Sequence, residues 1–411
     1  MPRTPQNAVT RLLQDVTDAR NIAPGDRVAV RPHRWLLGPA DGAAVLALLK
    51  RDQRKVKDPS RVTLFAAAGS SVAADAAAAG ITHLLPWPGC EIAQAVREGL
   101  VVPGEVAAST LPEIHALGGM GALGLRLPAA DIARGITGEP VHVTVPHTAR
   151  VDLSGSRQPL VGGRDVFWAA LHELGRERAV GRALEIAGPG LATLTLPERL
   201  ALASLAGHGG LFSAFCVADR GLIEEVNRFL SRPCRTIEPE KGAPLAAQGA
   251  LDLARVSLFV LPPGEATASA VTKHAGVPLQ AVVLGGQFGG SLAAMRHLAD
   301  CLRRRPLAAG LRAAVIPDTP AVLAEAERED LRERLADAGV QILAPGTAPE
   351  SWLRPGERAL LTTVTAPPGC WRAGYFAAAA AACAGAVQHP ERLEGADLRD
   401  SKLSTRRPRH G

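Results

Sequence analysis

Short apolar runs alternate with longer amphipathic segments along the whole chain. Runs of β-branched and apolar residues, separated by Gly and Pro, are typical of buried strands. Longer Ala-, Leu- and Arg-rich stretches with a helical period lie between them. This alternation predicts an α/β protein throughout. The predicted strands are Arg27–Val30, Val62–Ala66, Leu100–Val102, Val141–Val145, Val256–Leu261, Val282–Leu284, Ala313–Ile316 and Gln341–Leu343.

Two segments in the last third of the chain predict amphipathic helices. Ser291–Arg304 carries its leucines and Met295 on one stripe, and Pro320–Ala338 sets an apolar stripe against a Glu/Arg face. We interpret both stripes as core packing. The order strand, glycine-rich turn, helix, strand, helix, strand over 282–343 predicts parallel strands joined by right-handed crossovers.

The size of the chain predicts several domains. It has 411 residues, of which 47% are hydrophobic and only 3% aromatic. At ~100–200 residues per domain this length suggests two to four domains, with cores of Ala, Val and Leu. Connections rich in Gly and Pro near 136–160 and 262–275 are the expected boundaries. The predicted units are 1–135, 136–270 and 271–395, followed by a basic, flexible tail at 396–411.

The net charge of +6 is concentrated in short basic patches. They lie at Arg51–Lys57, Arg303–Arg305 and Arg406–Arg409. Such patches could contact nucleic acid or an acidic partner. Since no aromatic residues interleave with the charge, a solvated surface is the favoured interpretation and nucleic acid is not the expected partner.

The cysteines and the apolar stretches indicate a cytoplasmic protein. None of the six cysteines forms a C-x-x-C pair, and the chain shows no secretory leader. We therefore expect reduced thiols. The apolar stretch Ala377–Val387 is too short to cross a bilayer, so no membrane partner is expected.

The glycine-rich turn Gly285–Gly290 follows a predicted strand and opens a predicted helix. Helix N-termini bind anions, so the turn could cradle a phosphate. It lacks the Lys-Ser/Thr of a P-loop, and its spacing does not match G-x-G-x-x-G. A nucleotide site is therefore not favoured.

An ordered series of short segments resembles motifs that one protein family shares. Ala23–Asp26, running into Arg27–Val30, resembles "PGD-x-V-x-V", and Glu98–Val106 resembles "EGL-x-x-PGD-V". Glu185–Gly190 is similar to "EF-x-G-x-G", and Leu353–Glu357 to "L-x-PGE". In their order and spacing, over roughly residues 8 to 390, these segments resemble the large subunit of the aconitase and isopropylmalate dehydratase family.

The resemblance implies three α/β/α domains with mainly parallel sheets around a central cleft. It also implies that the family's fourth, swivelling domain is absent from this chain. In the dehydratases that domain is a separate small subunit, so a small partner subunit is one expectation. The alternative is that the chain acts alone or as a homo-oligomer.

The family holds a [4Fe–4S] cluster on three cysteines, with one iron open as Lewis acid for the substrate. In this chain the three cysteine positions fall on Gln287, Thr347 and Glu350. Amide, hydroxyl and carboxylate groups cannot replace thiolates at such a cluster. We therefore expect a cluster-free protein with no cofactor. Cys90 and Cys370 lie near former active-site segments, but buried packing is the favoured role for both.

The family's acid–base residues are replaced as well. An Asp-Ser-His motif falls on 111–113, and an Asn and a Glu fall on Ser204 and His208. An imidazole near pKa ~6.5 and a carboxylate could form an acid–base pair. The alternative is that these are surface or hydrogen-bonded loop histidines. Metal binding is not expected, because no H-x-x-x-H or H-x-x-E spacing links the candidates. The candidate catalytic residues are His115, Glu113 and His208, and the candidate substrate-binding residues are Gln287, Ser204 and Arg372.

These observations predict a repurposed, cluster-independent enzyme of lyase, isomerase or cyclase type that acts on a small molecule, for example in specialised metabolism. The first alternative is an inactive, aconitase-like pseudoenzyme that binds a partner or a ligand. RNA binding is a weaker third reading, since the fourth domain is missing and the basic residues are dispersed. The discriminating feature is whether Glu113, His115 and His208 converge in one closed pocket.

Overall fold

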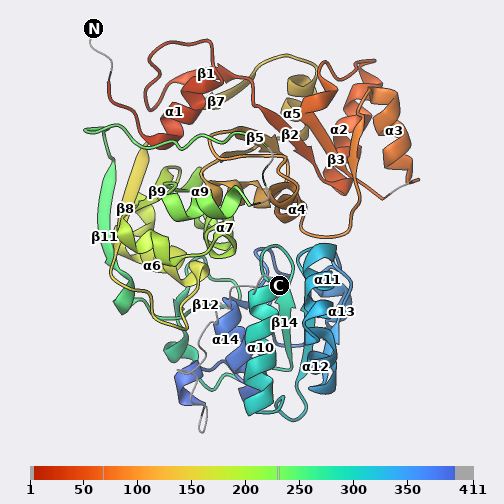
Figure 1. Cartoon of the computed structure of the whole chain (residues 1–411), viewed down its shortest axis with the longest axis vertical. Coiled ribbons are helices and arrows are strands. Elements are labelled where there is room, and N and C mark those ends of the chain that lie inside the picture. The colour runs from red at the N-terminus through yellow and green to blue at the C-terminus, as the bar shows by residue number, and fades with distance from the viewer. Residues whose placement is uncertain (1–3, 68, 229, 231, 394–411) are drawn as a thin grey trace, which may run out of the picture.

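The computed structural model describes residues 4–67, 69–228, 230 and 232–393, so the predicted tail at 396–411 lies outside the described residues. Three mainly parallel sheets occupy separate regions of the molecule, each with helices packed beside it (Figure 1). This arrangement confirms the predicted fold class.

The first sheet is fully parallel, with strand order β4-β3-β2-β5-β6. A separate antiparallel pair, β1 with β7, lies near the N-terminal helix α1. The strands are β1 (Arg27–Val30), β2 (Arg34–Leu37), β3 (Val62–Phe65), β4 (His83–Leu85), β5 (Val106–Ser109), β6 (Leu123–Arg126) and β7 (Val141–Thr144). The helices are α1 (Ala8–Asp15), α2 (Pro39–Arg51), α3 (Ser71–Ala79), α4 (Glu91–Arg97) and α5 (Ala129–Ile136).

The second sheet is also fully parallel, with strand order β10-β9-β8-β11. The 3₁₀ helix η2 (Pro112–Met120) reaches over from the first sheet and packs against α7 and β10. The strands are β8 (Thr148–Ser154), β9 (Ala183–Ala187), β10 (Ser213–Cys216) and β11 (Ala247–Asp252). The helices are α6 (Gly163–Leu174), α7 (Leu196–Ser204), α8 (Ala206–Gly209) and α9 (Arg220–Val226).

The third sheet has strand order β13-β12-β18-β17-β14-β15-β16. Strand β12 pairs antiparallel with β13 and β18, and the other pairs are parallel, as predicted for 282–343. The strands are β12 (Phe259–Leu261), β13 (Ser269–Ala270), β14 (Ala281–Gly285), β15 (Arg312–Ile316), β16 (Val340–Ile342), β17 (Ala359–Leu361) and β18 (Trp371–Ala373). The helices are α10 (Leu292–Arg304), α11 (Pro320–Arg328), α12 (Leu331–Asp337), α13 (Pro349–Trp352) and α14 (Tyr375–Ala384).

Each of the three main sheets draws its strands from one continuous stretch of chain, at 34–126, 148–252 and 259–373. Strands β12 and β13 therefore join the third sheet although they fall within the predicted unit 136–270. The domain boundaries themselves stay a prediction.

Two predicted elements are wrong. Leu100–Val102 is not a strand: Val101 and Val102 are buried, but the chain turns at Gly104, where φ is +86°, and pairs only from Val106 onward. A buried segment that pairs with no other strand has the same run of apolar residues as a buried strand, so the sequence alone does not distinguish the two. The single helix predicted over 320–338 is two helices, because Asp330 adopts a left-handed φ of 56°, which ends the first helix before the second begins.

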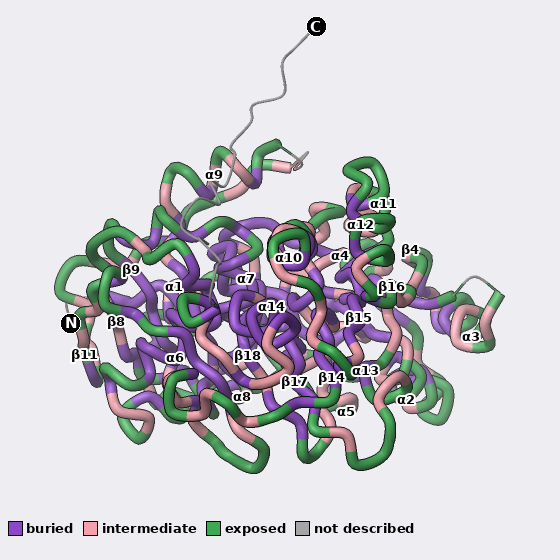
Figure 2. The backbone as a smooth tube through the Cα atoms, turned by 90° about the horizontal axis from the view of Figure 1, so that it is seen from below, coloured by how far each residue is buried: buried purple, intermediate pink, exposed green. Residues whose placement is uncertain are grey.

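The interior is built mainly from small aliphatic residues, and buried segments run through the middle of the molecule (Figure 2). The stretch Phe376–Cys383 of α14 is entirely buried. No helix in the described ranges is long and apolar enough to span a membrane. All six cysteines are free thiols, and Cys234 alone among them is not buried.

Candidate active site

The glycine-rich turn after β14 sets the geometry of the site. Gln287 and Phe288 both have left-handed φ values, of 27° and 64°. At Gly290 a Cβ atom would lie 1.9 Å from the carbonyl oxygen of Ile316, so the neighbouring strand approaches too closely for any side chain. The side chain of Gln287 is held by Thr365, whose hydroxyl donates a 2.6 Å hydrogen bond to Gln287 Oε1.

The side chains of Gln287, Thr347 and Glu350 line one cavity, which we call the Gln287 cavity. These are the three positions that the resemblance gives to the cluster cysteines. The cavity is completed by the loop before α4, so it lies between the first and third sheets. Its other side chains are those of Trp87, Cys90, Glu91, Ile316, Pro317, Asp318, Ala348, Pro349, Thr363 and Thr365.

The residues present do not fit an iron–sulfur cluster. Cluster irons are held by thiolates, and Cys90 supplies the one thiol on the wall of this cavity. Burial raises the pKa of the Cys90 thiol well above its ordinary value, which opposes formation of a thiolate. In the part of the chain that the structure describes, no group of three His, Cys, Asp or Glu side chains is placed to hold a metal ion.

Three carboxyl groups line the Gln287 cavity. Burial raises the pKa of Glu91, whose carboxylate accepts a 3.0 Å hydrogen bond from the Trp87 indole. Burial also raises the pKa of Asp318 to about 6, although hydrogen bonds from the glycine-rich turn and the charge of Arg164 act in the opposite direction. Glu350 lies exposed at the rim. Carboxyl groups that titrate nearer neutrality suit proton transfer.

Sequence reasoning missed Glu91 and Asp318 as site residues. Glu91 follows Cys90, which the resemblance already placed near a former active-site segment. Asp318 lies in the segment Ile316–Thr319, where the family pattern has Pro-Gly-Ser. The presence of a carboxylate where a glycine was expected was the signal that could have identified Asp318.

Arg164 forms the wall behind the glycine-rich turn. From the first turn of α6 its guanidinium donates hydrogen bonds to the carbonyl oxygens of Thr363 (3.2 Å) and Gln287 (3.1 Å). Burial lowers the pKa of Arg164 to about 10. The buried cation ties the second sheet to both loops of the third sheet that border the Gln287 cavity.

Glu113 and His115 lie on η2 and do not line the Gln287 cavity, although the charge of Glu91 on the cavity wall acts on Glu113. Both side chains are buried, and among the described residues neither Glu113 Oε1 nor His115 Nδ1 has a hydrogen-bond partner. Burial raises the pKa of Glu113 to about 7 and lowers the pKa of His115 to about 4. Glu113 is thus the more easily protonated group of the two, the reverse of an ordinary Glu and His.

Ser204 is the last residue of α7, and His208 lies on α8. Ser204 is buried, and its hydroxyl donates a 2.8 Å hydrogen bond to the Ala201 carbonyl. His208 is half-buried, and burial together with the nearby charges of Arg372 and Arg164 lowers its pKa to about 4.

Arg372 lies on β18 and lines a small pocket together with Arg164 and Thr363, so the structure brings Arg372 and Gln287 to either side of Thr363. Within the described residues, no hydrogen bond joins Glu113, His115 and His208.

Comparison with known proteins shows similarity to the aconitase family and to isopropylmalate dehydratase large subunits. The sequence model of the aconitase family (aconitate hydratase) matches residues 76–251. The 3-isopropylmalate dehydratase large subunit 2 of Rubrobacter xylanophilus is 27% identical over 94% of this chain and 98% of its own length. The corresponding large subunit of Nitratidesulfovibrio vulgaris is 29% identical over 76% of this chain and 79% of its own. This chain is therefore similar to the aconitase family over residues 76–251, and to these two large subunits over most of its length.

The aconitase family comprises hydratases and dehydratases, which are lyases, and both of these relatives are named as large subunits. Among solved structures, the aconitase X of Thermococcus kodakaraensis in its holo-form is similar, with a TM-score of 0.48 and 12% identity. That likeness covers 87% of this chain and 89% of the other.

Proposed function

We propose that this aconitase-family chain is a lyase- or isomerase-type enzyme that acts on a small molecule in the Gln287 cavity without an iron–sulfur cluster. The observation that carries the proposal is that Gln287, Thr347 and Glu350 line a single cavity. The presence of a cavity at these positions supports the proposal that a substrate still binds there. Its lining of amide, hydroxyl and carboxyl groups supports a reaction that does not use an iron–sulfur cluster.

In this proposal the carboxyl groups of the cavity transfer the protons. Glu350, at the rim, removes a proton from a substrate carbon, and Glu91, which burial keeps protonated to higher pH, protonates the departing hydroxyl. The carbon–oxygen bond then breaks and water leaves. Gln287 and Arg372 would hold polar groups of the substrate, because amide and guanidinium groups donate hydrogen bonds to carboxylates.

The residues on η2 need a movement before they can take part. Glu113 is 2% exposed and His115 is 6% exposed, so a substrate would reach them only if η2 moved away from α7. His208, which lies near the charge of Arg372, stays a proposed catalytic residue, and Ser204 stays a proposed substrate-binding residue. The alternative function, a pseudoenzyme, retains the cavity for ligand binding without turnover.

The absence of a cluster is tested by anaerobic reconstitution followed by iron and sulfide analysis. We expect no stoichiometric cluster in the native chain. The matched control is the triple variant Gln287→Cys/Thr347→Cys/Glu350→Cys, which restores three thiols in the same cavity and should take up more iron and sulfide. A stoichiometric cluster in the native chain would refute the proposal.

Turnover is tested after comparison of metabolites in strains with and without the gene has supplied a substrate. Glu91→Gln and Glu350→Gln should each lower kcat by about 10²-fold or more, whereas exposed Glu333→Gln on α12 should leave it unchanged. Full activity in both carboxyl variants would exclude this acid–base assignment. Tight binding of the accumulated metabolite with no turnover by native protein would instead support the pseudoenzyme.

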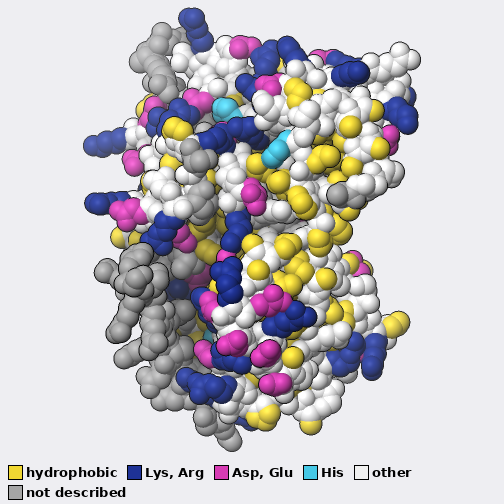
Figure 3. Space-filling view, turned by 45° about the vertical axis from the view of Figure 1, so that its right-hand side comes forward, with side chains coloured by type: hydrophobic (Ala, Val, Ile, Leu, Met, Phe, Trp, Pro, Cys, Tyr) yellow, Lys and Arg dark blue, Asp and Glu magenta, His cyan; other side chains and the backbone are white. Residues whose placement is uncertain are grey.

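We further propose that the chain works in the cytoplasm, with a small partner subunit or as a homo-oligomer. Both relatives are named as large subunits, which supports the first option. Hydrophobic side chains gather over the waist between the upper and lower parts of the molecule, where a partner could pack (Figure 3). Light scattering of the purified chain, alone and with the product of a neighbouring small-subunit gene, distinguishes the two. A monomeric mass under both conditions would contradict both.

A further inference from the structure

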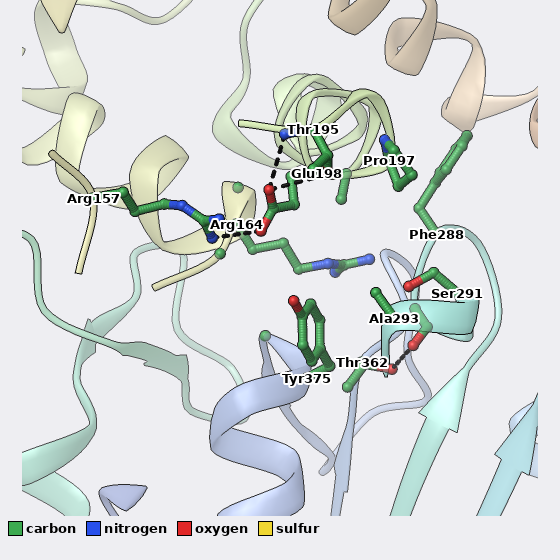
Figure 4. A pocket seen from close by; sticks show the side chains of 15 residues that line it. Arg157, Arg164, Thr195, Pro197, Glu198, Phe288, Ser291, Ala293, Thr362 and Tyr375 are labelled. Atoms are coloured by element: carbon green, nitrogen blue, oxygen red, sulfur yellow. Dashed lines mark hydrogen bonds and ion pairs between the residues drawn. The ribbon is translucent and has the colours of Figure 1, made fainter. Parts of the chain in front are cut away.

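Four helix N-termini line a second pocket (Figure 4). It contacts the glycine-rich turn through Phe288 and Gly289, whereas the Gln287 cavity contacts that turn through Gly286 and Gln287. The helices are α6, α7, α10 and α14, with 12, 9, 13 and 10 residues. Their N-cap residues, Gly162, Thr195, Ser291 and Gly374, all line this pocket. We call it the N-terminal pocket.

Such convergence makes the N-terminal pocket electropositive. Each helix N-terminus carries a partial positive charge and backbone N–H groups that lack partners inside the helix. Gly374 has no side chain with which to cap α14, so the first amides of that helix have no side-chain cap. Helix N-termini of this kind bind anions.

Arg164 independently indicates an anion. Arg164 is only 7% exposed, and Figure 4 shows its side chain extending into the pocket between Glu198 and Tyr375. A guanidinium has five N–H donors, and only the two bonds to the carbonyls of Thr363 and Gln287 are made. Among the described residues, the guanidinium of Arg164 donates no other hydrogen bond, and no carboxylate oxygen lies within 4.0 Å of its nitrogen atoms.

The carboxylates near the pocket are already engaged. Glu198 accepts a 3.0 Å hydrogen bond from the Thr195 amide and pairs with Arg157 at 2.5 Å. Asp165 accepts hydrogen bonds from the amides of Gly162 (3.0 Å) and Phe259 (2.8 Å). Arg164 is therefore the cation of this pocket that has no ion-pair partner of its own among the described residues.

The rest of the wall is apolar and defines the ligand's body. It is formed by Pro197, Ala201, Phe288 and Ala293 together with the ring of Tyr375. A ligand with one negative charge suits this lining, because the Glu198 carboxylate would oppose a second charge. We propose that the N-terminal pocket binds a small monocarboxylate with a compact apolar tail, whose carboxylate contacts Arg164 and the uncapped N-terminus of α14. This site does not depend on the proposed reaction in the Gln287 cavity.

Tyr375 makes the test direct, because it is the only tyrosine of the chain and it lines the pocket. Protein labelled with 3-fluorotyrosine should give one ¹⁹F resonance, to be titrated with sodium benzoate, isobutyrate and inorganic phosphate. We expect saturable shifts with benzoate and isobutyrate, and none with phosphate. Arg164→Met should weaken benzoate binding about tenfold or more, whereas Arg220→Met, which removes the same charge from the exposed surface of α9, should leave it unchanged.

A second variant keeps the test decisive if Arg164→Met does not fold. Ala293→Leu places a larger side chain on the pocket wall at the start of α10 and should abolish the benzoate shift without removing a charge. A resonance that does not move with either carboxylate would overturn the proposal. Equal benzoate affinity in folded Arg164→Met would do the same, and a shift with phosphate alone would overturn the monocarboxylate assignment.

Discussion

The Asp318 carboxylate accepts a 2.8 Å hydrogen bond from the backbone N–H of Gly290, across the turn that carries Gln287. The sequence of this turn suggested that it could cradle a phosphate. In the structure the chain's own carboxylate takes the place of such an anion, since it also interacts with the amides of Phe288 and Gly289. An external phosphate at this turn would have to displace Asp318.

Replacement of Asp318 by alanine should destabilise the fold. It leaves the Gly290 amide without its acceptor in a buried place, at a cost of about 1–3 kcal/mol. The measurement is a urea titration followed by circular dichroism. Asp337→Ala, at the exposed end of α12, is the control and should leave the midpoint unchanged. An unchanged midpoint in Asp318→Ala would show that the turn does not need its carboxylate.

Glu113 should make the protein less stable as the pH rises. Its pKa is about 7 in the folded chain against 4.5 ordinarily, so the folded state keeps a proton that the unfolded state releases. Stability from this group is therefore present below pH 4.5 and is lost as the pH rises to about 7, by about 3 kcal/mol.

Glu113→Gln should remove this dependence and be more stable than the native chain at pH 8, but similar to it near pH 4. Urea midpoints at both pH values give the answer. The exposed Glu98→Gln serves as the control and should follow the native profile. A variant that loses stability with rising pH as steeply as the native chain would contradict the assignment to Glu113.

Gly118 should tolerate no side chain. A Cβ atom at this position would lie 1.8 Å from the carbonyl oxygen of Ala214, where η2 packs on β10. Gly118→Ala must push the first sheet's η2 away from the second sheet, at a cost of about 1–3 kcal/mol or more. Gly221→Ala on α9, whose Cβ would meet only the Asp219 carboxylate at 3.4 Å, is the matched control. Equal thermal midpoints for both variants would contradict this packing.

The purified chain should not hydrate cis-aconitate or isopropylmaleate. The Gln287 cavity has no thiolate set to hold the Lewis acid that this reaction uses in the family. Loss of the ultraviolet absorbance of the conjugated acid is the assay, with a cluster-containing isopropylmalate dehydratase as the positive control. Clear turnover by metal-free protein would show that the cavity performs the family reaction by another route.

The sequence predicted well those helices and strands whose ends are set by neighbouring residues, such as a capping side chain or a turn. Ser291 caps α10 with its hydroxyl, and the stripe Met295, Leu298 and Leu302 is buried as its period indicated. Strand β3 was predicted to within one residue for the same reason, because a turn precedes it and its apolar run is short. Strand β5 was missed because burial of Val101 and Val102 occurs in a turn that only the three-dimensional packing fills.

The site was predicted less well, because its residues meet through long-range packing. The resemblance placed Gln287, Thr347 and Glu350 at related positions, and they line one cavity, whereas no local pattern brings Glu91 from the first sheet to the same cavity. The sequence also did not show which of the candidate side chains are buried. The predicted pair Glu113 and His115 has suitable chemistry, but only the packing of η2 against α7 shows that both side chains are enclosed.

Helix α14 has a consequence for how this chain can change over evolution. The side chains of Ala377–Ala382 are all buried in the core cluster that also includes residues of α10 and β14. Any larger side chain there would separate α14 from α10 and β14, and any smaller one would loosen the helix itself. This alanine-rich stretch, which has the simplest composition in the chain, should therefore accept the fewest substitutions.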